Sequence, residues 1–239
     1  MNKKFLVFIV HYNSFYLLKK IINEINKIDN KNFDVLISDD CSDLSIKKLK
    51  KLIESSKKKI FLNRNKYNFG YGKNIKYCLN FALKKKYKYA LMLHGDNQYK
   101  TKYIKTLFSK IKKYNLDIIC GSRMLKKSYA IKGKMPIYKF LGNIILTFFF
   151  NKIFKTKITD AHSGLWVYNL DIFKKIKLKN LSNGYLFDHE LRIELIKNGF
   201  DVNNEISIET KYSSEKSKFH ISYSINFVLR MLKFKFLNN

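Results

Sequence analysis

The sequence is poor in the residues that interrupt or cross-link a chain. Its 239 residues include one proline, Pro136, and three cysteines, Cys41, Cys78 and Cys120. The cysteines are widely spaced, which argues against a zinc site of paired cysteines and against a disulfide framework. A reduced, cytosolic compartment is therefore expected. The scarcity of proline also argues against a flexible linker between separate domains.

Acidic residues are scarce as well. The chain has 18 of them against 48 lysines and arginines, which gives a formal net charge of +30. Such a balance favours an anionic partner: nucleic acid, an anionic membrane surface or a phosphorylated substrate. A compositional bias toward Asn, Ile and Lys is the plainer explanation of the same charge. Nucleic acid is disfavoured because the lysines are spread over every segment and no nucleic-acid-binding motif appears.

Long hydrophobic runs are absent too. The most apolar segment, residues 140–154, contains Asn143 and Lys152 and falls short of the ~20 apolar residues that span a bilayer. We expect an interfacial or core helix there. Together with the basic, amphipathic residues 219–237, it predicts peripheral attachment to the cytoplasmic face of an anionic membrane. The alternative is that both segments pack on the rest of the protein.

Hydrophobic periodicity predicts alternating strands and helices. The 46% of hydrophobic residues is enough for one sizeable core. Strands are expected at 4–10, 33–38, 59–63, 87–93, 116–121, 164–169 and 201–212. Helices are expected at 14–28, with Ser14 as N-cap, and at 45–57, 72–85, 101–114, 136–154 and 185–198. This succession predicts an α/β fold with a doubly wound sheet. We expect one domain over residues 1–212, followed by a basic segment, 213–239, that contains an amphipathic helix.

Polar residues follow each of the first five predicted strands. The segments are HYNS (11–14), DDCSD (39–43), NRNKYNFGYGKN (63–74), HGDNQY (94–99) and GSR (121–123). A doubly wound sheet binds its ligand at the carboxyl ends of its strands, so these segments are expected to meet at one site. Any one of them alone is explained equally well as a solvated loop.

The residue types in these segments suit a phosphorylated ligand and a metal ion. Gly70 and Gly72 precede a helix and are expected to offer free backbone N–H groups to a phosphate. Asp96 and Gln98 supply hard oxygen ligands, and Mg²⁺ or Mn²⁺ needs few protein ligands when substrate phosphates complete its shell. Arg123 presents a guanidinium fork that suits a phosphate monoester.

The carboxylates have structural alternatives. Asp39 and Asp40 need no role beyond forming a turn; as ligand groups, one is expected to accept hydrogen bonds from a nucleobase or ribose while the other caps the next helix. Asp188 and Glu190 lie where acids interact favourably with the start of a helix. The same pair includes a candidate general base.

Taken in order, these motifs resemble glycosyltransferase family 2, whose members are inverting enzymes of the GT-A fold with a mixed sheet. Within it they resemble the branch of dolichyl-phosphate mannose synthase and polyprenyl-phosphate glucosyltransferases. The family's DDGSxD element appears with Cys41 in place of glycine, and its DxDxQ element appears with His94 in place of the first aspartate. ITDAHSGLWVY (158–168) is similar to the family's ITDxxSGFRxY. The resemblance covers roughly residues 4–220.

The resemblance implies a nucleotide-diphosphate sugar as donor and Mg²⁺ or Mn²⁺ as cofactor. The implied nucleotide-sugar-binding residues are Tyr12, Asn13, Asp39, Asp40, Gly70 and Asp96. The implied metal ligands are Asp96 and Gln98. The role of His94 stays open, because a neutral imidazole ligates Mn²⁺ whereas a protonated one hydrogen-bonds a diphosphate oxygen. A scaffold that has lost activity with the missing aspartate is the alternative.

Two acceptors are compatible with the implied chemistry. A polyprenyl phosphate is ionised near neutral pH and needs no general base. It would be held by Ser122, Arg123 and Lys218. A sugar hydroxyl, as in the synthesis of cell-surface polysaccharide, requires a carboxylate to take its proton, and Asp188 or Glu190 is the candidate. The expected catalytic residues are Asp96, Arg123 and Asp188.

Overall fold

The computed structural model describes residues 4–29, 32–212 and 226–232. Within them, seven strands form one mixed sheet in the order β3-β2-β1-β4-β6-β5-β7. Pairing is parallel between β1, β2, β3 and β4 and between β5 and β7, while β6 runs antiparallel to both of its neighbours. The strands are β1 (Phe5–His11), β2 (Phe33–Asp39), β3 (Ile60–Arg64), β4 (Tyr89–His94), β5 (Ile118–Ser122), β6 (Trp166–Asn169) and β7 (Glu205–Ser207).

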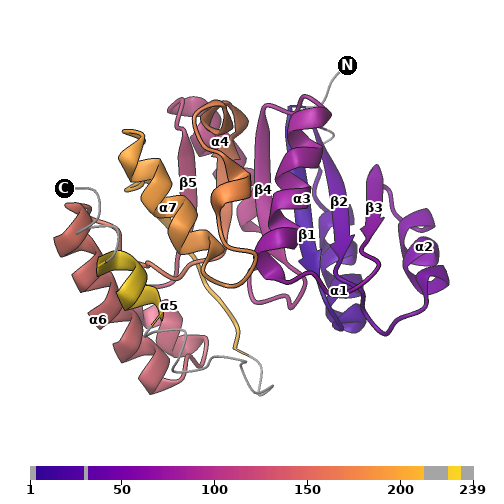
Figure 1. Ribbon diagram of the computed structural model, residues 1–239. Coiled ribbons are helices and arrows are strands. Elements are labelled where there is room, and N and C mark those ends of the chain that lie inside the picture. Colours follow the sequence, from indigo (N-terminus) through magenta and orange to yellow (C-terminus); the bar gives the residue numbers. More distant parts are fainter. Residues whose placement is uncertain (1–3, 30–31, 213–225, 233–239) are drawn as a thin grey trace.

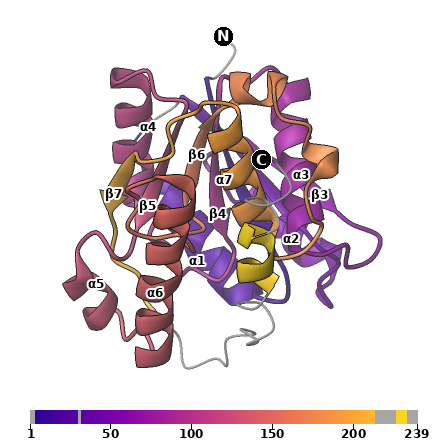
Figure 2. The same ribbon diagram turned by 60° about the vertical axis from the view of Figure 1, so that its left-hand side comes forward.

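Helices cover both faces of the sheet (Figures 1 and 2). In β1, Leu6 and Phe8 pack in the cluster that includes α3 and α7, whereas Val7 and Ile9 pack in the cluster that includes α1, α2 and α4. The helices are α1 (Phe15–Asn26), α2 (Ile46–Glu54), α3 (Tyr71–Lys84), α4 (Tyr103–Lys113), α5 (Lys127–Lys132), α6 (Ile137–Phe154) and α7 (Phe187–Lys197), with 3₁₀ turns η1 (Leu170–Lys174) and η2 (Leu178–Asn180). A doubly wound sheet buried on both faces confirms the predicted fold class.

Two local predictions are wrong. The strand expected over 201–212 is only three residues long, because Asp201 caps a turn by accepting a hydrogen bond from the backbone N–H of Asn203 at 2.9 Å. Ser14 occupies the N-cap position of α1 but does not cap it with its side chain. Its hydroxyl instead donates to the carbonyl oxygen of Gly95 at 3.2 Å, and so links the loops after β1 and β4.

Helix α6 has its polar side toward the protein and its apolar side toward the surroundings. Its buried residues are Asn143, Thr147 and Phe150. Ile137, Tyr138, Leu141, Ile145, Phe148 and Phe149 are each about half exposed or more. By length and composition alone, α6 is the one helix among the described residues that is long and apolar enough to cross a membrane, and 17% of it is buried. This arrangement reverses the polarity of an ordinary surface helix.

Part of the predicted C-terminal segment packs on the domain. Residues 226–232 are helical, and Phe227 and Met231 are fully buried. The Phe227 ring lies 4.1 Å from the His189 ring and 6.3 Å from the Phe150 ring, centroid to centroid. These contacts tie the segment to α6 and α7. Residues 213–225 and 233–239, which include Lys218, lie outside the described part of the chain, so the boundary at residue 212 stays a prediction.

Candidate active site

Four of the predicted polar segments lie side by side at one edge of the sheet, because they follow the neighbouring parallel strands β3, β2, β1 and β4. In the parallel register, His11 pairs with Asp39 across β1 and β2, and Val10 pairs with His94 across β1 and β4. Strand β6 separates β4 from β5, and because it is antiparallel, the residues before its start, including Gly164, reach the same edge. The edge therefore joins the segments after β1, β2, β3 and β4 with the HSG motif of residues 162–164.

Asp39 is fully buried and held within the protein. Its Oδ1 accepts a hydrogen bond from His11 Nδ1 at 2.8 Å, its carboxylate also accepts from Ser42, and Arg64 Nε lies 3.4 Å from Oδ2. Burial alone would raise the pKa of Asp39, but the hydrogen bonds from His11 and Ser42 outweigh it and leave the pKa lowered. Asp39 is thus an ionised anchor between β1 and β2, and a direct contact with a nucleobase stays a prediction.

Asp40 fastens the glycine-containing loop before α3. Its Oδ1 accepts from the Asn65 amide at 2.7 Å and from the Phe69 N–H at 3.0 Å, and its Oδ2 accepts from the Gly70 N–H at 2.9 Å. The expectation of a free N–H group at Gly70 is therefore wrong. Gly70 has a φ of +93°, a conformation that side chains rarely adopt, and a Cβ at Gly72 would lie 2.5 Å from the Ser182 carbonyl oxygen. Gly70 thus shapes the end of the loop, and Gly72 lets the first turn of α3 pack against Ser182.

Asn13 joins the loops after β1 and β2 in the same manner. The side-chain Nδ2 of Asn13 donates to Asp43 Oδ2 at 2.9 Å, and the side-chain Oδ1 of Asn13 accepts from the Asp43 N–H at 2.8 Å. Neighbouring Tyr12 remains 40% exposed at the edge of the sheet. The amide of Asn13 is already engaged by Asp43, and nucleotide binding by Tyr12 or Asn13 stays a prediction.

The donor atoms at Asp96 and Gln98 fit a metal ion that substrate phosphates help to bind. Asp96 is exposed, and its Oδ1 accepts from the Gln98 N–H at 3.0 Å in a tight turn. In the described part of the chain no group of three or more His, Cys, Asp and Glu side chains could hold a metal ion. One carboxylate and one amide suit Mg²⁺ or Mn²⁺ when phosphate oxygens and water fill the remaining positions.

His94 is connected to Asp188 through Tyr71. The Tyr71 hydroxyl donates to Asp188 Oδ2 at 2.7 Å and lies 2.9 Å from His94 Nε2. Because the single phenolic proton goes to Asp188, the pattern assigns a proton to His94 Nε2, which donates to the phenolic oxygen. Burial lowers the pKa of His94, so the ring is neutral, and its Nδ1 carries a lone pair that suits a metal ion but has no proton to donate to a diphosphate oxygen.

Asp188 is the candidate carboxylate whose pKa best suits acid–base chemistry near neutral pH. Burial raises its pKa to about 7, although the hydrogen bond from Tyr71 and the charge of Arg192 act in the opposite direction. Its Oδ1 is buried and has no hydrogen-bond partner among the described residues. Glu190, the other candidate, is bonded to the Ser182 N–H and paired with Arg230. Asp188 is therefore the better candidate base.

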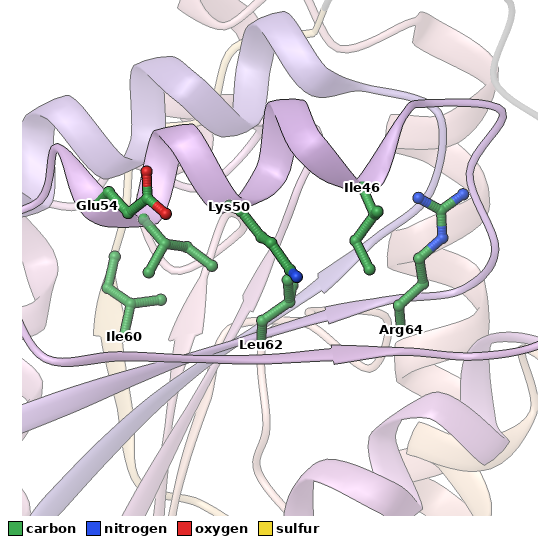
Figure 3. A pocket seen from close by; sticks show the side chains of 7 residues that line it. Ile46, Lys50, Glu54, Ile60, Leu62 and Arg64 are labelled. Carbon is green, nitrogen blue, oxygen red and sulfur yellow. The ribbon is translucent and has the colours of Figure 1, made fainter.

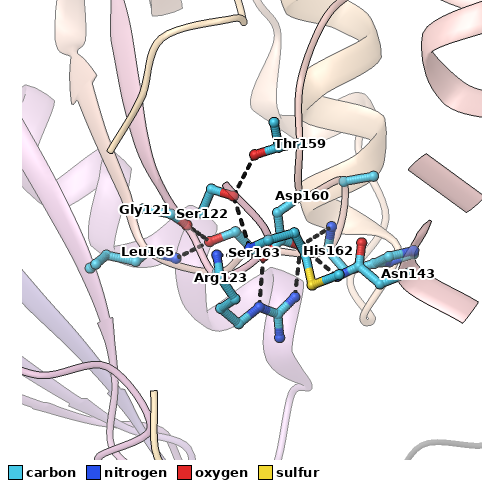
Figure 4. A network of polar contacts seen from close by, with 12 residues as sticks. Gly121, Ser122, Arg123, Asn143, Thr159, Asp160, His162, Ser163 and Leu165 are labelled. Carbon is cyan, nitrogen blue, oxygen red and sulfur yellow. Dashed lines mark hydrogen bonds and ion pairs between the residues drawn. The ribbon is translucent and has the colours of Figure 1, made fainter. Parts of the chain in front are cut away.

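Arg123 is held by a buried carboxylate that sequence reasoning did not identify (Figure 4). Its Nε lies 2.7 Å from Asp160 Oδ2, its Nη2 lies 2.8 Å from Oδ1, and its Nη1 donates to the Tyr212 hydroxyl at 2.9 Å. Burial would raise the pKa of Asp160, but the Arg123 charge and hydrogen bonds hold it well below its usual range. A phosphate would have to use the two remaining N–H groups of Arg123, so its acceptor-binding role stays a prediction.

The structure corrects the role expected for Ser122. Its side chain is fully buried, and its hydroxyl pairs with Thr159 Oγ1 at 2.6 Å while accepting from the Met124 and Leu125 N–H groups at 3.1 and 2.9 Å. One donor and two acceptors are the full capacity of a hydroxyl. Ser122 caps the turn after β5 and has nothing left for a phosphate.

One hollow lies apart from these residues. A cavity of about 430 Å³ between α2 and β3 is lined by four aliphatic side chains, together with Lys50, Glu54 and Arg64 (Figure 3). It opens at the outer edge of the sheet, where β3 is the terminal strand. None of the predicted site residues lines it, and its one link to the site is Arg64, whose Nε lies 3.4 Å from Asp39 Oδ2.

The model of the family described as "Glycosyl transferase family 2" matches residues 6–177, well over half of the chain. The chain belongs to glycosyl transferase family 2. This family 2 glycosyltransferase is 26% identical over 228 residues to an uncharacterized protein of Methanocaldococcus jannaschii, covering 92% of this chain and 95% of the relative. It is 27% identical over 125 residues to the low-salt glycan biosynthesis hexosyltransferase Agl6 of Haloferax volcanii, covering 52% of this chain and 29% of Agl6.

Solved structures establish the GT-A fold of this family 2 glycosyltransferase. A glucosyl-3-phosphoglycerate synthase from Mycobacterium tuberculosis, in complex with Mn²⁺, UDP and glucosyl-3-phosphoglycerate, superposes with a TM-score of 0.65 at 8% identity, over 97% of this chain and 79% of the other. The mannosyltransferase PcManGT from Pyrobaculum calidifontis, in complex with GDP-Man and Mn²⁺, gives 0.63 at 12% identity, over 95% and 64%. The family model and the hexosyltransferase relative confirm the enzyme class predicted from sequence, while the dolichyl-phosphate branch stays a prediction.

Sequence reasoning missed Tyr71, Asp160 and Gly164 as parts of the site. Asp160 and Gly164 lie within the segment ITDAHSGLWVY, whose motif was visible, but only the fold shows that Asp160 faces Arg123 and that Gly164 faces His94. Tyr71 is the first residue of α3 and lies between Gly70 and Gly72. A lone tyrosine carries no spacing signal, so only its hydrogen bonds reveal it.

Proposed function

We propose that this glycosyltransferase transfers a sugar from a UDP- or GDP-sugar to a polyprenyl phosphate at an anionic membrane surface on the cytoplasmic side. The observation that carries the proposal is α6, whose apolar row of Ile137, Leu141, Ile145 and Phe148 faces outward while Asn143 and Thr147 face the protein. Water does not favour this arrangement, but the acyl region of a membrane does. An acceptor with a long hydrocarbon chain would be presented at that surface.

Lysines surround the outward face of α6. Exposed lysines at the start of α5 and near both ends of α6 include Lys126, Lys127, Lys134, Lys152 and Lys155. Each basic residue near an anionic leaflet contributes about 1 kcal/mol of attraction. The combination of an apolar row and basic flanks supports peripheral attachment, with the strand-end site close to the lipid headgroups.

The chemistry at the site follows from the residues around it. Asp96 and Gln98 would hold Mg²⁺ or Mn²⁺, which neutralises charge on the diphosphate leaving group. The acceptor oxygen attacks the anomeric carbon from the face opposite the diphosphate, so the configuration inverts. A polyprenyl phosphate brings an oxygen that is already ionised, and the site then needs cations instead of a base. Arg123 and Lys218 remain the proposed cations.

A second acceptor is favoured by a different observation. Asp188 combines a pKa of about 7 with an unpartnered, buried Oδ1, which are the properties of a general base working near neutral pH. Such a base is needed when the acceptor is a sugar hydroxyl. Transfer to a hydroxyl of a glycan is therefore the second candidate function.

Incubation with labelled UDP- and GDP-sugars, Mn²⁺ and membranes tests these proposals. Label that appears in the organic extract and is released by mild acid supports a glycosyl phosphate lipid. Label that stays in a water-soluble glycan supports the hydroxyl acceptor and contradicts the lipid phosphate. If no labelled sugar is transferred, and neither UDP nor GDP with Mn²⁺ raises the melting temperature, the proposed transferase activity is wrong.

A further inference from the structure

We propose that Tyr71 is a positioning residue that orients Asp188, so that its Oδ1 receives a hydroxyl group of a bound sugar. This inference rests on the proposed function, because it requires a sugar in the site. It assigns a role to a residue that lies between Gly70 and Gly72 and is neither an expected metal ligand nor an expected nucleotide contact. The first observation is the short bond from the Tyr71 hydroxyl to Asp188 Oδ2, at 2.7 Å.

Tyr71 is fixed from several sides. Its hydroxyl also accepts from His94 Nε2 at 2.9 Å, and its ring lies 5.5 Å from the Tyr185 ring in a stacked arrangement. The neighbouring Gly70 and Gly72 pack so closely against residues 182–184 that neither position has room for a side chain. A donor held so firmly fixes the direction of the carboxylate that accepts from it, which is how outer residues set the geometry of reacting ones.

Tyr71 acts as a donor and keeps its proton. Burial and the neighbouring Asp188 charge raise its pKa well above the ordinary value. Proton transfer through the phenol is thus disfavoured, and the proton of an incoming hydroxyl goes to Asp188 Oδ1, the oxygen without a partner in the described structure. The other groups that face Asp188 are Arg192 on α7 and Tyr168 on β6, and neither is hydrogen-bonded to Oδ1.

The hydroxyl belongs either to the acceptor or to the donor sugar. With an acceptor hydroxyl, Oδ1 takes the proton while the acceptor oxygen bonds to the anomeric carbon and the diphosphate leaves with the electron pair of the broken bond. With a donor-sugar hydroxyl, Oδ1 accepts a hydrogen bond and no proton moves. The two cases share one recognition chemistry and differ in which kinetic constant depends on Tyr71.

The test is Tyr71→Phe, with Tyr87→Phe as the matched control. Tyr87 makes the same kind of bond, from its hydroxyl to Asp34 Oδ2 at 2.6 Å, at the opposite edge of the sheet. For both variants one measures kcat, KM and the pH–rate profile with the nucleotide sugar that the wild type uses best. The affinity for UDP and GDP with Mn²⁺ and the pKa of Asp188 by ¹³C NMR complete the set.

For an acceptor hydroxyl we expect Tyr71→Phe to lower kcat about 10- to 100-fold. The acid limb of the profile moves to higher pH, because the lost hydrogen bond had lowered the pKa of Asp188. For a donor-sugar hydroxyl, KM for the nucleotide sugar rises instead, with kcat and the affinity for UDP or GDP unchanged. In both cases the Asp188 pKa rises in Tyr71→Phe and stays constant in Tyr87→Phe.

Three results overturn the inference. One is a Tyr71→Phe variant with the kinetic constants of Tyr87→Phe. Another is an Asp188 pKa that does not change, which the NMR measurement reports whether or not the enzyme turns over. The third is a joint loss of melting temperature and UDP or GDP affinity, which marks a purely structural role. If the wild type neither binds nucleotide nor transfers sugar, the proposed function itself is wrong, and the NMR result still decides whether Tyr71 controls Asp188.

Discussion

Arg123 and Asp160 face one another across two parallel hydrogen bonds, Nε to Oδ2 at 2.7 Å and Nη2 to Oδ1 at 2.8 Å. Both side chains are buried. We expect Asp160→Ala to lower the free energy of unfolding by about 3–5 kcal/mol, because it leaves an uncompensated buried charge. Urea denaturation measures the change. Asp171→Ala is the control, since Asp171 pairs with Lys88 on the surface and should cost less than about 1 kcal/mol.

The same pair predicts a dependence of stability on acid. The pKa of Asp160 is lower in the folded protein than in the unfolded chain. Its contribution is therefore fully present above about pH 4 and is lost as the pH falls further toward the folded-state value. Asp160→Asn should show a flatter decline of stability below pH 4 than the wild type. An unchanged acid profile would show that the pair does not control acid unfolding.

Gly164 lies against the His94 ring, where a Cβ would come within 2.5 Å of Cε1. Gly164→Ala must displace His94 from Tyr71, and overpacking of this kind costs about 1–3 kcal/mol. We expect a lower melting temperature and reduced turnover. Gly142→Ala is the matched control, because nothing lies within 4 Å of its Cβ position in α6. It should stabilise the protein by about 0.5–1 kcal/mol.

The order of strands and helices and the location of the site were predictable from sequence, because buried strands and polar strand ends leave a periodic signal. The partners of the site residues were not. Ser122 and Arg123 follow a strand as expected, yet their hydrogen bonds go to Thr159 and Asp160, nearly forty residues later in the chain. Burial and long-range pairing decide whether a polar side chain is free, and neither is encoded in local spacing.

Cys41 adopts a φ of +64°, in the left-handed region that favours glycine. The family motif has glycine at this position, and a side chain there costs about 1–2 kcal/mol. Replacing Cys41 by glycine removes this cost, but the greater conformational freedom of glycine in the unfolded chain offsets part of the stabilisation. We expect Cys41→Gly to stabilise the protein by about 0.5–1 kcal/mol in chemical denaturation. Cys41→Ala removes the thiol but keeps the strained backbone, so equal stabilisation by alanine would refute strain as the cause.

Asp96 is exposed, and its Oδ1 accepts a hydrogen bond from Gln98 within the same turn, so Asp96→Ala should change the stability of the ligand-free protein by no more than about 0.5 kcal/mol. The effect of Asp96→Ala is expected on metal binding instead. We expect Mn²⁺-dependent protection by UDP or GDP in thermal unfolding to disappear, together with sugar transfer. Asp171→Ala, an exposed carboxylate change beyond the other end of the sheet, should retain both. Retained transfer in Asp96→Ala would remove Asp96 from the metal site.

The outward face of α6 predicts how the protein binds membranes. Leu141 and Phe148 are 52% and 60% exposed, and burying each side chain in lipid is worth about 1.5–3 kcal/mol. Leu141→Glu combined with Phe148→Glu should therefore weaken binding to anionic vesicles at least about 100-fold while leaving the melting temperature nearly unchanged. Tyr114→Glu, at an exposed aromatic residue after α4, serves as the control and should bind like the wild type. If the α6 variant sediments with vesicles as well as the control does, lysine charge alone accounts for membrane binding, and α6 does not enter the lipid.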